Sequence, residues 1–124
     1  MPVNRETLKT KFENVYALGD ITTIKLPGQY EPTKPLNLPK AGVFSHYQAE
    51  VVAENIWAEI HGEIPKRKFP GKGSCFLELG NSVAGFAGGN FYKLPYPEVK
   101  MYPPLKFWHW AKIGFEKWWL RRWF

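Results

Sequence analysis

Two short stretches of this 124-residue sequence combine residue types that could hold a ligand. In the first, Gly19 and Asp20 directly follow an apolar segment at residues 14–18, so a carboxylate comes just after a predicted strand. In the second, Pro39 to Gly42 precede a run of helical periodicity. A carboxylate can accept hydrogen bonds from ligand hydroxyls, and a helix N-terminus offers free N–H groups and the positive end of its dipole.

The second stretch introduces the longest predicted helix, which starts after Pro39 and Gly42 and runs to about Ile60. Neither Pro nor Gly suits a helix interior, so both mark its start. A glycine there lets a ligand approach the backbone, and the position suits a phosphate or a ring that becomes negative, such as a reduced flavin. An ordinary core helix with a Pro-Gly entry is the alternative interpretation. The helix has an apolar side, expected to face the core, and an acidic side; their residues are Ala49, Val52, Ala53, Ile56 and Ile60, and Glu50, Glu54 and Glu59, respectively.

The first stretch predicts a buried strand over residues 14–18 that ends at Gly19-Asp20. Ligands of open α/β sheets bind at the carboxyl edge of the strands, which is where Asp20 would lie. The alternative is that Gly-Asp only makes a turn. The connection over residues 21–38 is long and interrupted by prolines and Gly28, so neither a regular helix nor a central strand is expected there.

The second half of the chain predicts an antiparallel hairpin followed by a helix. Residues 74–79 and 83–92 are the two strand candidates, joined by a turn at residues 80–82. Residues 93–104 contain four prolines and are expected to be extended, and a helix is expected from Leu105 to the end. The predicted fold class is therefore α+β: a short strand and long helix over residues 1–62, then a hairpin and C-terminal helix over residues 63–124, in one compact unit.

The positive charge of the chain is concentrated at its end. The net charge is +6, and residues 99–124 hold six Lys or Arg against one Glu, which gives +5. On a helical wheel the aromatic face of this segment contains Phe107, Trp108, Ala111, Gly114, Phe115, Trp118 and Trp119. Such a basic, aromatic helix could lie on an anionic membrane surface, contact a second copy, or pack on the hairpin of its own chain. Nucleic-acid binding is disfavoured, because most charges lie opposite the aromatic face.

Several classes of function are excluded or disfavoured by composition. No run approaches the roughly 18 apolar residues of a membrane span, and the N-terminus lacks the apolar core of a signal peptide, so a cytoplasmic location is expected. The single Cys75 excludes an internal disulfide framework, and it is expected to be a small buried hydrophobe. The three histidines show no metal-ligand spacing, so no metal site and no catalytic residue is predicted.

Taken in order, the motifs resemble the C-terminal third of FAD-dependent pyridine nucleotide-disulfide oxidoreductases. Asn14-Val15-Tyr16-Ala17-Leu18-Gly19-Asp20 resembles their second flavin-binding motif. Leu38-Pro39-Lys40-Ala41-Gly42-Val43-Phe44 follows it as in the sulfide:quinone oxidoreductase, flavocytochrome c sulfide dehydrogenase and type II NADH dehydrogenase branch. Residues 73–80 and 108–118 look like that branch's C-terminal hairpin and closing helix. The resemblance covers residues 8–124.

The resemblance implies a role for each matching position. Gly19 and Asp20 would bind the ribityl chain of FAD. Lys40 and the backbone of Ala41, Gly42 and Val43 would face the flavin ring and stabilise its reduced form. Two aromatic residues, Phe44 and Tyr47, would form part of a quinone site. The closing helix would touch a membrane or a second copy through Phe107, Trp108, Phe115, Trp118 and Trp119.

The chain also departs from the pattern of that family. The GxGxxG motif that cradles the FAD pyrophosphate is absent, as is a second nucleotide-binding domain. Where some sulfide-oxidising members have a redox cysteine, this chain has Ile21-Thr22-Thr23. We therefore expect these 124 residues to be inactive alone, as a split subunit, a remnant or a fragment whose FAD domain is supplied by a partner. A non-enzymatic module that self-associates or binds a membrane surface is the alternative.

Overall fold

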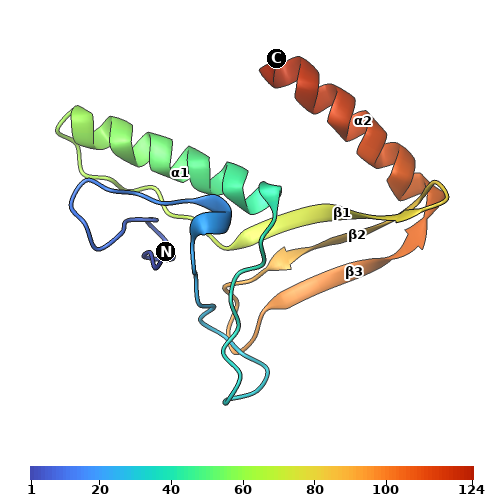
Figure 1. Ribbon diagram of the computed structural model, residues 1–124, viewed down its shortest axis with the longest axis horizontal. Helices are drawn as coiled ribbons and strands as arrows, with labels where there is room; N and C mark the ends of the chain where they lie inside the picture. Colours follow the sequence, from blue (N-terminus) through green and yellow to red (C-terminus); the bar gives the residue numbers. More distant parts are fainter. The chain divides into compact units, whose positions relative to one another are not determined.

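The computed structural model describes all 124 residues and has mixed α and β secondary structure (Figure 1). The three-stranded antiparallel sheet has the strand order β1-β2-β3. These elements confirm the α+β prediction. In chain order they are the 3-10 helix η1 (Gly19–Ile21), α1 (Gly42–Ile60), β1 (Lys72–Gly80), β2 (Val83–Asn90), β3 (Glu98–Leu105) and α2 (Lys106–Trp123).

The chain divides into two compact units. Unit 1 contains Met1–Gly73 and Asn90–Glu98, and unit 2 contains Ser74–Gly89 and Val99–Phe124. This division differs from the expected boundary at residue 62. The reason is that residues 90–98 return to the N-terminal region, where Phe91 N–H donates to the Gly71 carbonyl at 2.8 Å and the Tyr92 hydroxyl donates to the Arg5 carbonyl at 2.7 Å.

The predicted start and end of the long helix are confirmed. Helix α1 begins at Gly42, directly after its N-cap Ala41, and ends at Ile60. The chain then turns through Gly62, whose φ of +72° is the left-handed conformation that commonly ends helices. His61 N–H and Gly62 N–H donate to carbonyls of the last turn, so those carbonyls have partners.

The buried face of α1 is not the one that its apolar residues predict. Val52 is buried as expected, but Ala49, Ala53, Ile56 and Ile60 are exposed. The buried positions are Phe44, Gln48, Val51, Val52 and Asn55. Two of these are polar, and each is only 1% exposed because its amide group bonds to backbone that packs on the helix. Those bonds set the rotation of α1, and the apolar stripe is left facing outward.

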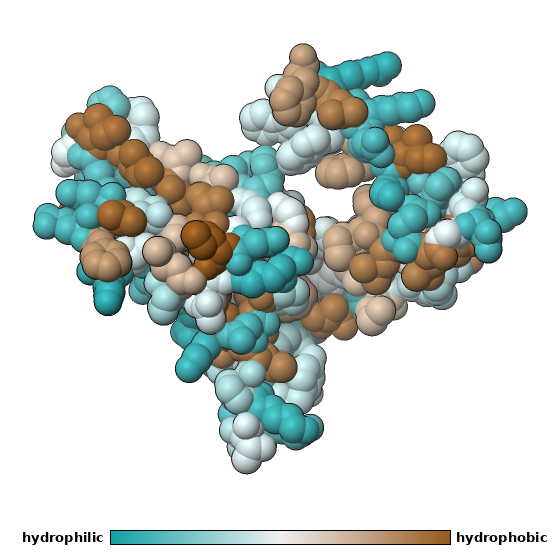
Figure 2. All heavy atoms as spheres, viewed as in Figure 1, coloured by the Kyte–Doolittle hydropathy of each residue, from teal (hydrophilic) through white to brown (hydrophobic).

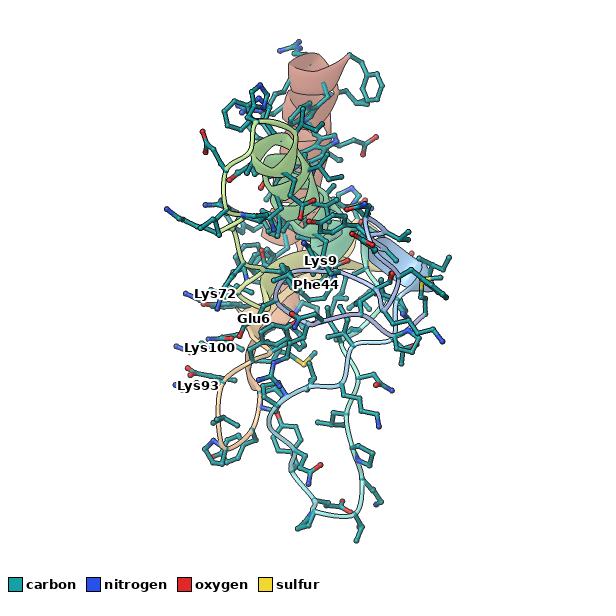
Figure 3. The ribbon with its side chains drawn as sticks, turned by 90° about the vertical axis from the view of Figure 1, so that its left-hand side faces the viewer. Glu6, Lys9, Phe44, Lys72, Lys93 and Lys100 are labelled. Carbon is teal, nitrogen blue, oxygen red and sulfur yellow. The ribbon has the colours of Figure 1, made fainter.

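The core of unit 1 forms around the ring of Phe44, which Figure 3 shows in the interior. It makes edge-on contacts with Phe69 and Phe91, at centroid distances of 6.3 and 5.1 Å. It also lies directly against Gly73, where a Cβ atom would come within 2.4 Å of the Phe44 ring. Only glycine therefore lets β1 start this close to the helix. The other buried apolar residues of this core are Leu8, Ile24, Leu38, Val51 and Val52.

Residues 14–18 do not form the predicted strand. Their only pairing is an isolated antiparallel bridge between Lys9 and Tyr16, with one hydrogen bond on each side of it. Asn14 has a φ of +58°, which breaks a ladder at that point. A strand needs a neighbouring strand of similar length. The only segment that pairs with residues 14–18 is residues 8–10, which is too short to form a ladder with them. The Gly-Asp that follows is the start of η1.

The predicted hairpin is confirmed and gains a third strand. Strands β1 and β2 are joined by Asn81 and Ser82, both with positive φ (51° and 58°), as the tightest type of hairpin turn requires. Residues 98–104 of the expected extended segment, together with Leu105, where the helix was expected to begin, pair with β2 as β3. Their prolines are tolerated because β3 lies at an edge of the sheet.

In unit 2, the first half of α2 packs on the sheet. The Trp108 ring stacks on Phe86 at 5.0 Å and meets Tyr102 at 5.6 Å, and Phe115 meets Phe76 at 6.1 Å. Trp108 and Phe115 therefore contact the sheet of their own chain. Packing on the chain's own hairpin is one of the three interpretations that the sequence leaves open for this helix. No residue of α2 is fully buried, and Phe107 and Trp118 are exposed.

Glu78 of β1 also attaches the first half of α2 to the sheet, through two ion pairs. Glu78 accepts hydrogen bonds from Lys112 at 3.0 Å and pairs with His109 at 2.9 Å. Hydrogen bonds from the Lys112 ammonium and, to a smaller extent, from His109 hold the pKa of the Glu78 carboxyl below its usual value. A lowered carboxyl pKa means that this attachment is present at neutral pH and is lost as the pH falls through the folded-state pKa of Glu78.

Neither α1 nor α2 combines the length and the continuous apolar character that a helix needs to cross a bilayer.

Asn55 is predicted to stabilise the rotation of α1. Its side chain donates to the Arg67 carbonyl at 2.9 Å and accepts from the Arg67 N–H at 3.0 Å. Asn55→Ala leaves both backbone groups unpaired, so we expect a loss of about 1–3 kcal/mol in the free energy of unfolding. Urea denaturation measures it.

The neighbouring Glu54→Ala is the matched control, because it removes only an exposed ion pair with Arg67. It should change the free energy of unfolding by less than about 0.5 kcal/mol. Equal effects of the two substitutions would contradict a structural role for Asn55.

Candidate functional site

The first predicted ligand position is held against the N-terminal half of α1. Gly19 N–H donates to the Gln48 side-chain oxygen at 2.7 Å, and the Gly19 carbonyl accepts from the Thr22 hydroxyl at 2.7 Å. Gly19 has a φ of +72°, and a Cβ atom there would lie 3.0 Å from the Ser45 hydroxyl oxygen. Glycine is thus needed for both conformation and space, and it brings η1 onto the helix.

A small open pocket lies between η1, the segment before α1 and the first turns of α1. Its cavity volume is about 10 Å³. Its lining includes four of the predicted cofactor-binding residues, Gly19, Asp20, Lys40 and Ala41. Two segments more than 20 residues apart in the sequence therefore meet at one place. Pockets that enclose a whole ligand measure roughly 300–1,000 Å³, so this pocket has room for about one water molecule, and a larger ligand would lie across its open side.

Asp20 is the one carboxylate at this pocket. Its side chain is exposed and makes no hydrogen bond or ion pair within the chain. A carboxylate in that position can accept hydrogen bonds from hydroxyl groups of a ligand without first breaking an internal contact. Its exposure also means that the fold does not depend on it.

The N-terminus of α1 supplies donors at the same end of the helix. Ala41 provides no side-chain cap, and the N–H groups of Gly42 and Val43 have no partner in the chain, whereas Phe44 N–H donates to the Ala41 carbonyl. No atom lies within 4 Å of the position that a Cβ atom of Gly42 would take, so its backbone is open to approach. Gly42 and Val43 lie beside the pocket but do not line it.

Lys40 lines the pocket, but its ammonium is engaged within the chain. It donates to the Thr22 carbonyl and so ties the segment after η1 to the entry of α1. This contact gives Lys40 a structural role. Its predicted effect on a reduced flavin stays a prediction, and it would require the ammonium to leave or share that carbonyl.

The two predicted quinone contacts differ in their surroundings. Phe44 lines the pocket but is only 5% exposed, because its ring is part of the core. Tyr47 is exposed, does not line the pocket, and lies beside His46 at a centroid distance of 5.7 Å. The structure thus brings Phe44 to the other site residues and leaves Tyr47 apart, and the quinone role stays a prediction for both.

The hydrogen-bonding groups at the pocket are of the kinds that one part of a flavin would need. Unpaired amides at the start of α1 suit a group that becomes negative, and Asp20 suits the hydroxyls of a ribityl chain. No element of the chain offers a glycine-rich turn leading from a strand into a helix, which is the usual cradle for a pyrophosphate. The polar groups around the pocket are thus of the kinds that a flavin ring and ribityl chain would need at an open surface, and a support for the adenine nucleotide half is lacking.

Sequence reasoning missed three residues that build this site: Thr22, Ser45 and Gln48. Gln48 carries the contact between η1 and α1, and its only sequence signal is its place four residues after Phe44, on the same helical face. A buried polar side chain on a core-facing helix stripe usually forms a hydrogen bond with backbone, and that rule could have identified Gln48 as a site residue.

Searches with this sequence and structure against protein-family models, curated proteins and solved structures found no match.

Gln48 is predicted to stabilise the fold, whereas Asp20 is predicted to bind a ligand without contributing to stability. Gln48→Leu leaves the partly buried Gly19 N–H without a partner, so the free energy of unfolding should fall by about 1–3 kcal/mol. Asp20→Ala removes an exposed side chain with no partner, so the change should stay within about 0.5 kcal/mol. Thermal and urea unfolding by circular dichroism measure both. If Asp20→Ala unfolds the chain, Asp20 is a structural residue and not a ligand position.

Proposed function

We propose that this chain contributes the flavin-ring and ribityl part of an FAD site in an oxidoreductase of the sulfide:quinone oxidoreductase type, completed by a nucleotide-binding domain outside these 124 residues. The observation that carries the proposal is the meeting of Gly19-Asp20 with the uncapped N-terminus of α1 at one pocket. The motif resemblance predicts these two segments to act together, and they are adjacent only in the folded chain.

The proposed role of each group follows from its position. A bound flavin would supply two-electron transfer between a donor and a quinone. Asp20 would accept hydrogen bonds from ribityl hydroxyls and so orient the ring. The N–H groups of Gly42 and Val43, with the helix dipole behind them, would favour negative charge on the ring and so raise its affinity for electrons.

Riboflavin phosphate is predicted to bind the intact chain weakly at this pocket. Because only part of the ligand is contacted, we expect a dissociation constant on the order of millimolar, which corresponds to about 4 kcal/mol. In a ¹H–¹⁵N NMR titration the amide signals of Gly19, Asp20, Gly42 and Val43 should shift. Asp20→Asn should weaken binding severalfold, because it removes a charged acceptor.

Adenosine monophosphate is the matched control, since it has the phosphate and a ribose but neither isoalloxazine nor ribityl group. It should leave the same signals unchanged. Equal shifts with both compounds would mean general anion binding, and no shift with riboflavin phosphate at several millimolar would refute a flavin site in this chain.

Peripheral binding to anionic membranes is a second candidate, supported by the exposed aromatic and basic residues of α2. Phe107, Trp110 and Trp118 are exposed, as are Lys117 and Arg121. Trp rings favour the headgroup level of a bilayer, and each basic residue near an anionic surface contributes about 1 kcal/mol. A quinone dissolves in the lipid, so an enzyme that reduces it gains from such a contact.

Loss of three basic residues from α2 is predicted to reduce vesicle binding. K117Q/R121Q/R122Q should lower the partition coefficient onto phosphatidylserine-containing vesicles by roughly 100-fold, at about 1 kcal/mol per charge. The control K11Q/K25Q/K34Q makes the same charge change in unit 1 and should have a much smaller effect. Co-sedimentation at low salt measures both. If the unmodified chain stays in the supernatant, α2 is not a membrane contact.

A further inference from the structure

Helix α2 covers one face of the sheet in unit 2 and leaves the other face open. Phe76 of β1, Phe86 of β2 and Tyr102 of β3 all contact aromatic residues of that helix. Because successive residues of a strand point to opposite faces, their neighbours form the other face. This free sheet face consists of Cys75, Leu77 and Leu79 of β1, Val83, Gly85, Ala87 and Gly89 of β2, and Val99, Met101, Pro103 and Leu105 of β3.

The free sheet face is apolar throughout, and none of its residues is charged. Met101, Leu79 and Leu105 are 73%, 61% and 50% exposed. A Cβ atom at Gly85 would lie 3.7 Å from the Leu77 Cβ atom, so neighbouring strands present these residues on one side. Exposed apolar residues that are contiguous across three paired strands mark an interaction site.

The outer side of α1 is an apolar surface of a different kind. Figure 2 shows hydrophobic spheres along that side, with hydrophilic ones among them. Side chains of both signs line the groove there, namely Glu54, Glu63, Lys66 and Arg67. Such a surface can bind water and polar partners, whereas the free sheet face offers only apolar contact. The free sheet face therefore needs an apolar partner surface.

Charge favours a second copy of the chain as that partner. Unit 2 contains six Lys or Arg against Glu78 and Glu116, so most contacts between two copies of it would bring like charges together. A contact through the free sheet face brings none together, because the face carries no charge. An anionic membrane would be held by basic residues on the contacting face, and this face has none.

Side-chain size across the face also suits packing against an identical face. The outer strands β1 and β3 present larger side chains, such as Leu77 and Met101, whereas Gly85, Ala87 and Gly89 of the middle strand are small. The space over β2 lets the side chains of two such faces interdigitate at the separation of about 10 Å that packed sheets adopt. A two-fold axis makes each such contact twice.

We propose that two copies of this chain associate through their free sheet faces, so that the two sheets form a sandwich across a two-fold axis. Every residue of this contact belongs to unit 2. The proposal does not rest on flavin binding or on the pocket at the start of α1.

The size of the contact indicates a weak, reversible dimer. Strands lie about 4.8 Å apart and rise about 3.3 Å per residue, so a face of three such strands measures roughly 15 Å by 25 Å. Because its side chains protrude, two copies together would bury on the order of 1,000 Å² of accessible surface, near the lower limit for a specific interface. We therefore expect a dissociation constant on the order of micromolar.

A charge placed on the free sheet face tests the proposal. Ala87→Lys adds one at the middle of the face, and Met101→Lys adds one at a side chain that is already largely exposed, where the fold does not depend on it. In analytical ultracentrifugation the intact chain should pass from monomer to dimer as its concentration rises, and each variant should dimerise at least 10-fold more weakly. Added salt should not weaken the dimer, because no ion pair holds it.

Ile60→Lys is the matched control, because it makes a similar change at a residue of α1 that is 76% exposed, outside unit 2. It should dimerise like the intact chain. Far-UV circular dichroism of every variant checks that the fold is kept. If Ala87→Lys fails to fold, Met101→Lys decides the outcome.

Mixing opposite charges tests whether the face binds its own copy. Ala87→Lys and Ala87→Glu should each be weak dimers, but their mixture should associate more strongly than either alone, because opposite charges then meet at the middle of the contact. Fluorescence energy transfer between differently labelled variants measures this. Met101→Lys with Met101→Glu repeats the test at an exposed position.

The single thiol of the chain gives an independent readout. Cys75 lies on the free sheet face and is half-buried within its own chain. Its reaction with a small thiol reagent should slow severalfold as the protein concentration rises through the dissociation constant. Met101→Lys should remove that dependence on concentration.

Four results would overturn the proposal. The intact chain could be a monomer at every concentration up to about the millimolar range. Met101→Lys could dimerise like the intact chain, or Ile60→Lys could abolish the dimer, and either would place the contact elsewhere. A mixture of the Lys and Glu variants that associates no better than each alone would refute a contact between identical faces.

Discussion

The hydrogen bond from Gly19 N–H to the buried Gln48 side chain is the contact on which the candidate site depends. It draws η1 onto α1, so that Asp20 and the start of the helix share one pocket. Together with the two bonds of Asn55, it also fixes the rotation of α1. The backbone groups of Gly19 and Arg67 that pack against α1 would be costly to leave unpaired, so the polar side chains that bond to them face inward and the isoleucines face outward. One rotation thus forms the pocket at one end of α1 and leaves the apolar stripe of the helix facing outward.

Local signals in the sequence predicted the elements well. Pro39 and Gly42 mark the start of α1, and Asn81-Ser82 marks a tight turn, because these residues act through their own backbone conformation. The inward face of α1 was predicted wrongly, since counting apolar residues cannot find a stripe that contains Gln48 and Asn55. The strand at residues 14–18 failed for a different reason. Its pairing depends on a neighbour, and periodicity within one segment contains no information about a neighbour.

Local sequence patterns predicted the candidate site only in part, for the same reason. Gly19, Asp20 and the start of α1 were singled out from motifs, and the fold places them at one pocket. The burial of Phe44 and the contact between Lys40 and the Thr22 carbonyl depend on packing between distant segments, so no local pattern could give them.

The contact between Phe44 and Gly73 has a consequence for how this sequence can change over generations. A side chain at position 73 would occupy space that the Phe44 ring already fills. A larger residue at position 73 is therefore admissible only after the ring at position 44 has become smaller, and a smaller ring alone leaves a cavity in the core. Each single step disturbs the packing of the core whereas the double change can preserve it, so we expect the two positions to change together, although 28 residues of chain lie between them.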